Sequence, residues 1–195
     1  MYLLLLCSLT VVAIAIDRFM LYRRASQGAR ALEADVAAAL RKKKLDEIAP
    51  AVKGKDNMVA HLVQSVVDAR AAGEDVPMTV EAVYGEAAML LRARLNYLSM
   101  IVTLAPLLGL LGTISGMIQS FSVFNLQAGQ PMAITGGIGE ALVATATGLL
   151  VAILALVVHT YFAQRMDTML TLLEKTMNTL LAGFAANDGG HSHAS

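Results

Sequence analysis

Three threonines and one glutamate lie in the most apolar part of the sequence, where their side chains could transfer protons. They are Thr113, Thr145, Thr147 and Glu140, and Glu140 is the only charged residue in the 95–164 stretch. A hydroxyl group can both donate and accept a hydrogen bond, so it can pass a proton without carrying a fixed charge. A carboxylate inside a membrane is costly and by default indicates a function. Together these residues mark a candidate functional site within a membrane.

A serine and a histidine offer a second chemistry, that of an intramembrane protease. Ser115 and His159 would have to share a hydrogen bond as nucleophile and base. However, His159 lies about 21 residues, or about 30 Å, along its apolar segment, whereas Ser115 lies in the outer third of the preceding one. We therefore expect no enzymatic activity. We also expect no metal or cofactor, because two histidines in a polar tail, His191 and His193, are weak evidence of a metal site.

Three apolar segments are long enough to cross a bilayer, whose core of about 30 Å takes about 20 helical residues. They cover residues 1–21, 96–122 and 138–162. Of all residues, 56% are hydrophobic, which is more than an ordinary soluble domain contains. In the first segment the arginines follow the apolar run, which is typical of an anchor and not of a secretory signal. The sequence predicts an all-α membrane protein with three transmembrane helices.

Basic residues set the predicted orientation. Arginines follow the first and third spans and precede the second, whereas residues 123–137 contain no Lys or Arg. Because cytoplasmic loops are enriched in Lys and Arg, the N-terminus is predicted outside and the C-terminus inside. The cytoplasm then contains a helical region over 22–95 and a C-terminal helix over 163–187. Residues 123–137 form a periplasmic loop, and residues 188–195 form a disordered tail.

The 22–95 region is expected to form helices that pack outside the membrane. One helix is predicted to end at Pro50, and a second to stop at Gly73. A third is predicted to begin with Thr79 as its cap and to continue into the second span. The basic run 41–44 could contact anionic lipid or nucleic acid, but a solvated helix face is the favoured interpretation. We expect no nucleic-acid partner.

Helical rise converts positions in the second and third spans into depth. Thr113 lies about 14 Å from the outer end of its span near Ser122, and Thr145 lies about 11 Å from the start of its span. The two threonines are therefore predicted at similar depth near the middle of the membrane. A simpler alternative is that Thr113, Thr145 and Thr147 each bond a carbonyl of their own helix, which is common.

Small residues recur at helical spacing along the second and third spans. In lipid they let two backbones approach closely, which drives helix association in place of the hydrophobic effect. Pro106 can bend its helix. Three helices alone can hardly use all of these faces, so an oligomer is predicted. The residues predicted to pack helix against helix are Gly109, Gly112, Gly116, Ala141, Gly148 and Ala152.

The segments LAPLLGLLGTISGMIQSF and GGIGEALVATATGLLVAI resemble the ExbB/TolQ/MotA family of proton-channel proteins, most closely the ExbB branch and next the TolQ branch. The segment IDRFMLYRRA, where the family tends to have an acidic-Arg pair and a basic cluster, is also similar. By motif, Thr113 and Thr145 match pore-lining threonines, and Glu140 matches the family glutamate. One departure is Leu154, which stands where many relatives have a proline.

The resemblance implies a multi-pass subunit of a motor in the bacterial inner membrane, driven by the proton-motive force. It implies a homopentamer, surrounded by membrane lipid, around an ExbD- or TolR-like single-span partner with an intramembrane aspartate. Work would pass to a TonB- or TolA-like protein that spans the periplasm. An ExbB-like role in TonB-dependent transport and a TolQ-like role in envelope maintenance stay open, and a non-conducting scaffold is a third alternative. Because this chain has no carboxylate at mid-depth, we expect the partner to supply the proton-binding acid.

Overall fold

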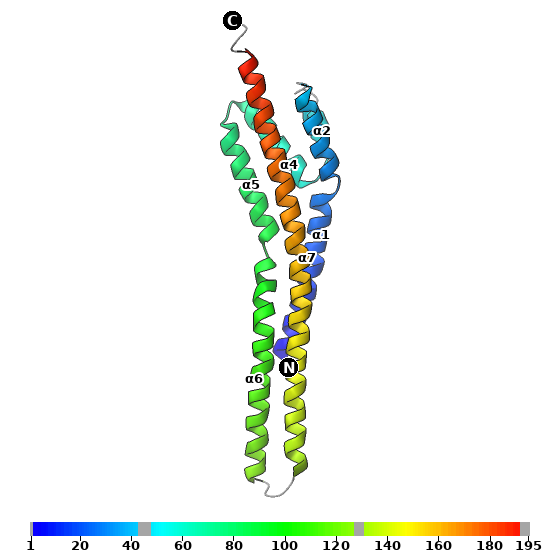
Figure 1. Ribbon diagram of the computed structural model, residues 1–195, viewed down its shortest axis with the longest axis vertical. Coiled ribbons are helices and arrows are strands. Elements are labelled where there is room, and N and C mark those ends of the chain that lie inside the picture. The colour runs from blue at the N-terminus through cyan, green and yellow to red at the C-terminus, as the bar shows by residue number, and fades with distance from the viewer. Residues whose placement is uncertain (1, 43–47, 127–130, 192–195) are drawn as a thin grey trace. The chain divides into compact units, whose positions relative to one another are not determined.

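All regular secondary structure in the computed structural model is helical, and the structure describes residues 2–42, 48–126 and 131–191. Three stretches within it are long and apolar enough to cross a membrane, namely Tyr2–Arg41, Val76–Ser122 and Gly136–Ala186. The predicted all-α class and the three candidate membrane-spanning helices are thereby confirmed. The helices are α1 (Tyr2–Ser26), α2 (Ala29–Arg41), α3 (Ile48–Val52), α4 (Met58–Ala72), α5 (Val76–Arg92), α6 (Leu95–Leu126) and α7 (Pro131–His191) (Figure 1).

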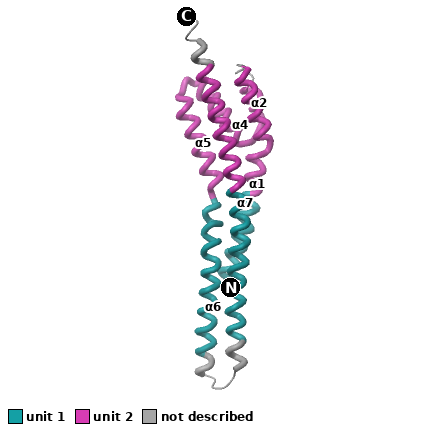
Figure 2. Tube along the Cα trace, viewed as in Figure 1, with its two compact units in different colours: residues 1–18, 94–163 teal, residues 19–93, 164–195 magenta. Residues whose placement is uncertain are grey.

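The chain divides into two units (Figure 2). Unit 1 contains residues 1–18 and 94–163, and unit 2 contains residues 19–93 and 164–195. Helices α1 and α7 contribute residues to both units, α6 belongs to unit 1 alone, and α2 to α5 belong to unit 2 alone.

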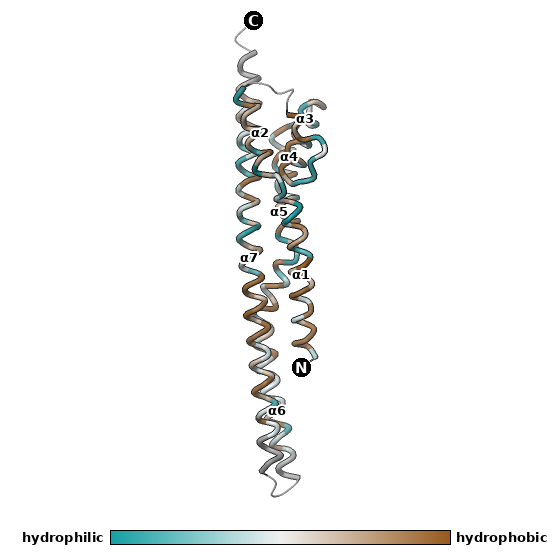
Figure 3. The backbone as a smooth tube through the Cα atoms, turned by 90° about the vertical axis from the view of Figure 1, so that its right-hand side faces the viewer, coloured by the Kyte–Doolittle hydropathy of each residue, from teal (hydrophilic) through white to brown (hydrophobic). Residues whose placement is uncertain are grey.

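Unit 1 presents large apolar side chains on its surface. Leu107, Ile118, Leu142 and Leu150 are between 60% and 68% exposed, although they are among the most apolar residue types. Figure 3 shows the corresponding segments of α6 and α7 mostly in the brown of hydrophobic residues. Exposed apolar surface of this extent marks contact with a membrane or a protein partner. Unit 1 is therefore the membrane part of the protein.

Helix α5 does not continue into α6, contrary to the prediction from sequence. Ala93 and Arg94 separate the two helices, and Arg94 has a φ of 66°. This left-handed conformation costs about 1 kcal/mol in a residue with a side chain. Within unit 1, the Arg94 guanidinium lies 3.0 Å from the Asp17 carboxylate, which offsets part of that cost. Neither Gly nor Pro marks the break, so local sequence rules could not find it.

The end of α5 is stabilised within unit 2 by a side chain from α1. A helix end leaves its last carbonyl groups without backbone partners. The Tyr22 hydroxyl donates a hydrogen bond to the Leu91 carbonyl at 2.9 Å, and Tyr22 itself is only 5% exposed. A neutral hydrogen bond of this kind contributes about 1 kcal/mol.

The core of unit 2 contains large apolar side chains, as expected for a helical domain in water. Asn57 caps α4 by accepting a hydrogen bond from the Ala60 amide at 2.8 Å, and its amide donates to the Gln27 carbonyl at 3.1 Å. The predicted stop at Gly73 is confirmed, since Gly73 caps the C-terminus of α4 with a φ of 73°. Fully buried core side chains include Leu32, Val36, Val59, Leu62, Val63, Leu173 and Leu180.

Two helix boundaries predicted in this region are wrong. Helix α2 ends at Arg41, and Pro50 lies inside the short helix α3 and not at the end of a longer one. The cap of α5 is Asp75, which accepts a hydrogen bond from the Met78 amide at 3.2 Å, whereas Thr79 lies within the helix. Pro50 lies in the first turn of α3 and Pro77 in the first turn of α5, where a proline sacrifices no backbone hydrogen bond. Residues 43–47 lie outside the described residues.

Helices α6 and α7 extend into the predicted 123–137 loop. Helix α6 ends at Leu126, α7 begins at Pro131, and residues 127–130 lie outside the described residues. Helix α7 also continues through the predicted C-terminal helix to His191, into the predicted disordered tail, of which residues 192–195 are not described. Extending an existing helix adds one hydrogen bond per residue, so polar residues can prolong it.

Candidate functional site

Helices α6 and α7 approach most closely at two facing glycines. A Cβ atom on Gly148 would lie 2.7 Å from the Ala105 carbonyl oxygen and 3.0 Å from the Gly109 Cα. A Cβ atom on Gly109 would lie 3.1 Å from the Ala144 carbonyl oxygen. Because these neighbours are backbone atoms, they cannot move aside as a flexible side chain could. Only glycine fits this contact without displacing a helix.

The same helix pair stays close toward the α6–α7 connection. A Cβ atom on Gly112 would lie 2.8 Å from the Ala144 Cβ, and one on Gly116 would lie 2.9 Å from the Ala141 Cβ. Several residues predicted from sequence to pack helix against helix thus form a contact within one chain. Ala152, which is 8% exposed, lies one helical turn after Gly148 on the same face. Ala144 was missed, although its spacing of three from Ala141 and four from Gly148 was a usable signal.

The hydroxyl of Thr145 crosses from α7 to α6. It donates a hydrogen bond to the Gly109 carbonyl oxygen at 3.1 Å, between residues 36 positions apart in the chain. A carbonyl group can only accept, so the hydroxyl uses its hydrogen here and keeps lone pairs that can accept further hydrogen bonds. Interhelical bonds of this kind contribute about 0.6 kcal/mol in membranes. Thr145 is therefore held at the closest approach of the two helices.

Thr113 and Thr147 bond their own helices, as the simpler alternative predicts. The Thr113 hydroxyl donates to the Leu110 carbonyl at 2.7 Å, and the Thr147 hydroxyl donates to the Val143 carbonyl at 2.8 Å. Gly109, which is bonded to Thr145, lies one helical turn before Thr113. The depths of Thr113 and Thr145 therefore differ by no more than about 6 Å along α6. Thr145 alone of the three breaks the pattern of bonding within a helix.

Glu140 lies on an exposed part of α7, five residues before Thr145 in the sequence. That separation corresponds to about 8 Å along a helix axis. The neighbouring Gly137 contacts the Ser120 side chain of α6, so this stretch of α7 still runs beside α6. Glu140 therefore lies between the start of α7 at Pro131, nine residues or about 14 Å away, and the Thr145 level.

The serine and histidine considered for protease chemistry are far apart. Ser115 is next to Gly116, which packs against Ala141 of α7. His159 lies 18 residues beyond Ala141. Along a helix this separation is about 27 Å, too far for a nucleophile and base to share a hydrogen bond.

In unit 1, the acidic-Arg pair of the IDRFMLYRRA segment forms an ion cluster with a residue that precedes α6. The Asp17 carboxylate lies 3.0 Å from the Arg18 guanidinium and 3.0 Å from that of Arg94. Arg18 is only 6% exposed, so its pairing with Asp17 offsets part of the cost of burying its charge. The adjacent Asp and Arg were a signal for a local pair, but the third member comes from a segment more than 70 residues away.

Several known proteins are similar to this chain. A putative biopolymer transport protein, ExbB-like 1 of Synechocystis, is 51% identical over 65 residues, which are 31% of this chain and 26% of that protein. The biopolymer transport protein ExbB of Salmonella typhimurium is 38% identical over 74 residues, 37% of this chain and 30% of that protein. The Tol-Pal system protein TolQ of Pseudomonas aeruginosa is 32% identical over 108 residues, 55% of this chain and 47% of that protein.

These matches cover only part of each relative, between 26% and 47% of its length. The match to a family model is longer. Residues 50–175, which include α4, α5, α6 and the part of α7 that carries Thr145, match the model of the MotA/TolQ/ExbB proton channel family. Together with the membrane helices and their glycine contact, this match shows that the chain belongs to the MotA/TolQ/ExbB proton channel family.

Proposed function

We propose that this chain is an ExbB-like subunit of a motor in the bacterial inner membrane that uses the proton-motive force. Five copies would surround an ExbD- or TolR-like single-span partner and energise TonB-dependent transport across the outer membrane. The observation that carries this proposal is the Thr145 hydroxyl, which bonds across to α6 within the chain's most apolar stretch. The subunit would be a channel component and not an enzyme.

The proposed orientation places the N-terminus and the α6–α7 connection in the periplasm and unit 2 in the cytoplasm. It is supported by the arginines that border unit 1 on one side, including Arg18 and Arg94, and by the absence of Lys and Arg from residues 123–137. With this orientation, the Asp17 ion cluster lies at the cytoplasmic boundary of the membrane.

The bonding of Thr145 fits an exchange of protons with a partner acid. In the present arrangement its oxygen can accept a hydrogen bond from a protonated carboxylic acid or from water. To serve the ionised carboxylate it must instead donate, which requires the hydroxyl to rotate away from the Gly109 carbonyl. The two bonding states of one hydroxyl thus match the two protonation states of a passing acid.

The acid itself must come from outside this chain. Within the 95–164 stretch the only carboxylate is Glu140, which is separated from Thr145 by about 8 Å of helix. The proposed partner, with its intramembrane aspartate, would supply the missing group. Each proton that crosses yields about 2.3 kcal/mol per 100 mV, so several protons are needed for substantial mechanical work.

The experiment compares Thr145→Val, Thr145→Ser and Thr147→Val, each coexpressed with an ExbD- or TolR-like single-span protein and reconstituted in liposomes. Proton flux under an imposed gradient is the measured quantity. Thr145→Val should abolish the flux, because valine has a similar shape but no hydroxyl. Thr145→Ser should retain it, and Thr147→Val, a matched loss on the same helix, should leave most of it.

Assembly is measured in the same preparations by native mass spectrometry, so that loss of flux can be separated from loss of the complex. If Thr145→Val kept the wild-type proton flux, Thr145 would not be part of the proton pathway. Absence of flux in the wild-type complex, when it is intact, would favour the non-conducting scaffold.

A TolQ-like role is the second candidate. The similarity to the Pseudomonas TolQ protein extends over 108 residues, longer than the 74 residues matched by the Salmonella ExbB protein, although the identity is lower, at 32% against 38%. Expression in cells that lack either ExbB or TolQ separates the roles. Restored TonB-dependent uptake supports the ExbB-like role, and restored resistance to detergents supports the TolQ-like role.

A further inference from the structure

Helix α5 carries an apolar stripe on its exposed face. Met78 and Met89 are each 72% exposed, and the exposed Ala82 and Gly85 lie between them. The spacing of four, three and four residues places these positions on one side of the helix. Two methionines at this exposure, in a unit with a well-buried core, indicate a surface that binds a protein.

Acidic side chains border this stripe, which we call the α5 stripe. Glu81 and Glu86 are exposed, and helical geometry places them about 60° to 80° to either side of the stripe. Glu74 and Asp75, also exposed, precede the helix. A partner for α5 should therefore offer an apolar groove with basic residues on its rim.

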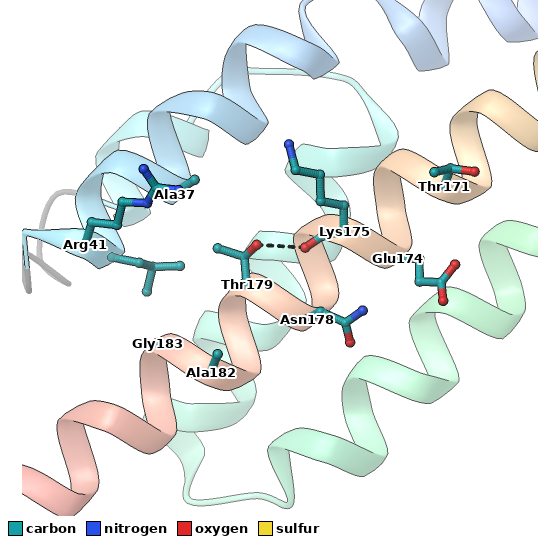
Figure 4. A pocket seen from close by; sticks show the side chains of 10 residues that line it. Ala37, Arg41, Thr171, Glu174, Lys175, Asn178, Thr179, Ala182 and Gly183 are labelled. Atoms are coloured by element: carbon teal, nitrogen blue, oxygen red, sulfur yellow. Dashed lines mark hydrogen bonds between the residues drawn. The ribbon is translucent and has the colours of Figure 1, made fainter.

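Unit 2 contains a groove of that description between α2 and α7 (Figure 4). Its volume is about 690 Å³. Its apolar lining consists of Ala37 and Leu40 of α2 and Ala182 and Gly183 of α7, and its uncharged polar lining consists of Thr171, Asn178 and Thr179 of α7. At Gly183 a Cβ atom would lie 2.6 Å from the Leu40 Cδ2, so the glycine lets α7 pack closely against Leu40 of α2. We call this the α2–α7 groove.

Basic side chains lie along the rim of the groove. Arg41 and Lys175 both line it, and a smaller adjoining cavity of about 350 Å³ shares these two residues and adds Lys42. Lys175 is bonded to Glu33 at 3.1 Å but is still 66% exposed, so part of its charge faces outward. Glu174 also lines the groove, which makes Arg41 and Lys42 the stronger attraction for an acidic helix.

We propose that the α5 stripe of one copy of this chain docks into the α2–α7 groove of a second copy. Charge complementarity supports this partner: an apolar ridge between glutamates fits the apolar part of the groove, which lies beside basic residues. In Figure 1, α5 and α2 appear on either side of α7 within unit 2, so one copy can use both surfaces at once. Such a contact is head-to-tail and repeats around a ring. It rests on the proposed function, which requires an oligomer.

Paired cysteines test the contact in native membranes. The single cysteine of the chain, Cys7, is first removed as Cys7→Ser. In this background, Ala82→Cys is combined with Ala37→Cys and treated with a short bismaleimide. A head-to-tail contact should give a ladder that extends beyond the dimer, because each copy carries both cysteines. Ala71→Cys combined with Ala37→Cys is the control, since Ala71 is exposed on α4 outside both surfaces, and it should give no ladder.

Either of two patterns overturns the inference. One is a paired variant without cross-links, and the other is a strong dimer from Ala82→Cys alone, which would mean that two α5 stripes face one another. Native mass spectrometry of the same samples separates the proposals. An intact oligomer without a ladder rejects this contact alone, whereas a monomer rejects both this contact and the proposed assembly. A ladder without proton flux keeps the contact and rejects the motor.

Charge reversal provides a second, independent measurement. Glu81→Lys with Glu86→Lys should lower the cross-linking yield about two- to fivefold, the effect expected of exposed ion pairs. Arg41→Glu with Lys42→Glu should lower it by a similar factor. The four changes together should restore the yield, because they exchange the signs on both surfaces. A combined variant as weak as its parents would contradict the pairing.

Discussion

The helices within unit 1 and the helices within unit 2 pack through different kinds of side chain. In unit 1, α6 and α7 meet through glycines and alanines, and leucines such as Leu107 and Leu150 point outward. In unit 2, the large apolar side chains such as Leu32 and Leu173 are buried, and the exposed Lys175 pairs with the buried Glu33. Leucines at these positions thus lie outside in unit 1 and inside in unit 2.

The solvent explains this difference. Water drives apolar side chains together, whereas lipid tails are as apolar as leucine and give no such drive. Helices in lipid therefore gain from close backbone contact and from hydrogen bonds between helices. The Thr145 hydrogen bond therefore stabilises helix packing in unit 1, and buried leucines stabilise it in unit 2. Substitutions can test each of these contributions.

The largest expected effect comes from truncating leucines in the two units. Leu32→Ala in unit 2 should cost about 3 kcal/mol, because it leaves a cavity in a core where Leu32 is 0% exposed. The expected decrease in melting temperature is about 10 °C. Leu150→Ala, at a position 68% exposed, should change it little. Thermal unfolding of both variants in detergent checks the contrast, and equal effects would mean that Leu150 is buried in the assembled protein.

Within unit 1, replacing a glycine at the helix contact by a larger residue should destabilise the protein, whereas the same change away from the contact should not. Gly148→Leu should destabilise the protein by about 2 kcal/mol, because its side chain meets the backbone of α6. The expected decrease in melting temperature is about 6 °C. Gly139→Leu is the matched control on the same helix, since a Cβ atom there has nothing within 4 Å. A Gly148→Leu variant as stable as the control would contradict the close helix contact.

A smaller effect is expected from the ion pair of unit 2. Glu33 has a side chain only 9% exposed, and it bonds Lys175, which is 66% exposed. Glu33→Gln should cost about 1 kcal/mol, because Lys175 can turn toward water once its partner is neutral. The corresponding decrease in melting temperature is about 3 °C. A decrease beyond that of Leu32→Ala would indicate that Lys175 is buried in the assembly.

The smallest effect on stability is expected at Thr145. Thr145→Val removes one interhelical hydrogen bond and should cost about 0.6 kcal/mol, or about 2 °C in melting temperature. Thr145→Ser should cost less, since serine keeps the hydroxyl. If Thr145→Val unfolds the complex, its loss of proton flux would report structure and not proton transfer.

The sequence predicted the membrane part well because its signals are local. Composition alone located three apolar helices, and residue spacing located the small-residue faces around Gly112 and Gly116. The Gly73 stop was equally local. The α5–α6 break could not be found in this way, because Arg94 is held by Asp17 and the end of α5 by Tyr22, both far away in the chain.

For the candidate site too, some features could be predicted from the sequence and others depend on the tertiary structure. The sequence by itself determined which residues of the 95–164 stretch carry hydroxyl and carboxyl groups and that they lie among apolar residues, because side-chain chemistry and helical period need no partner. Only the tertiary structure decided that Thr145, and not Thr113 or Thr147, bonds the neighbouring helix. That choice depends on the register of α6 against α7, which is fixed by glycine contacts between residues from 17 (Gly137 and Ser120) to 43 (Gly148 and Ala105) positions apart.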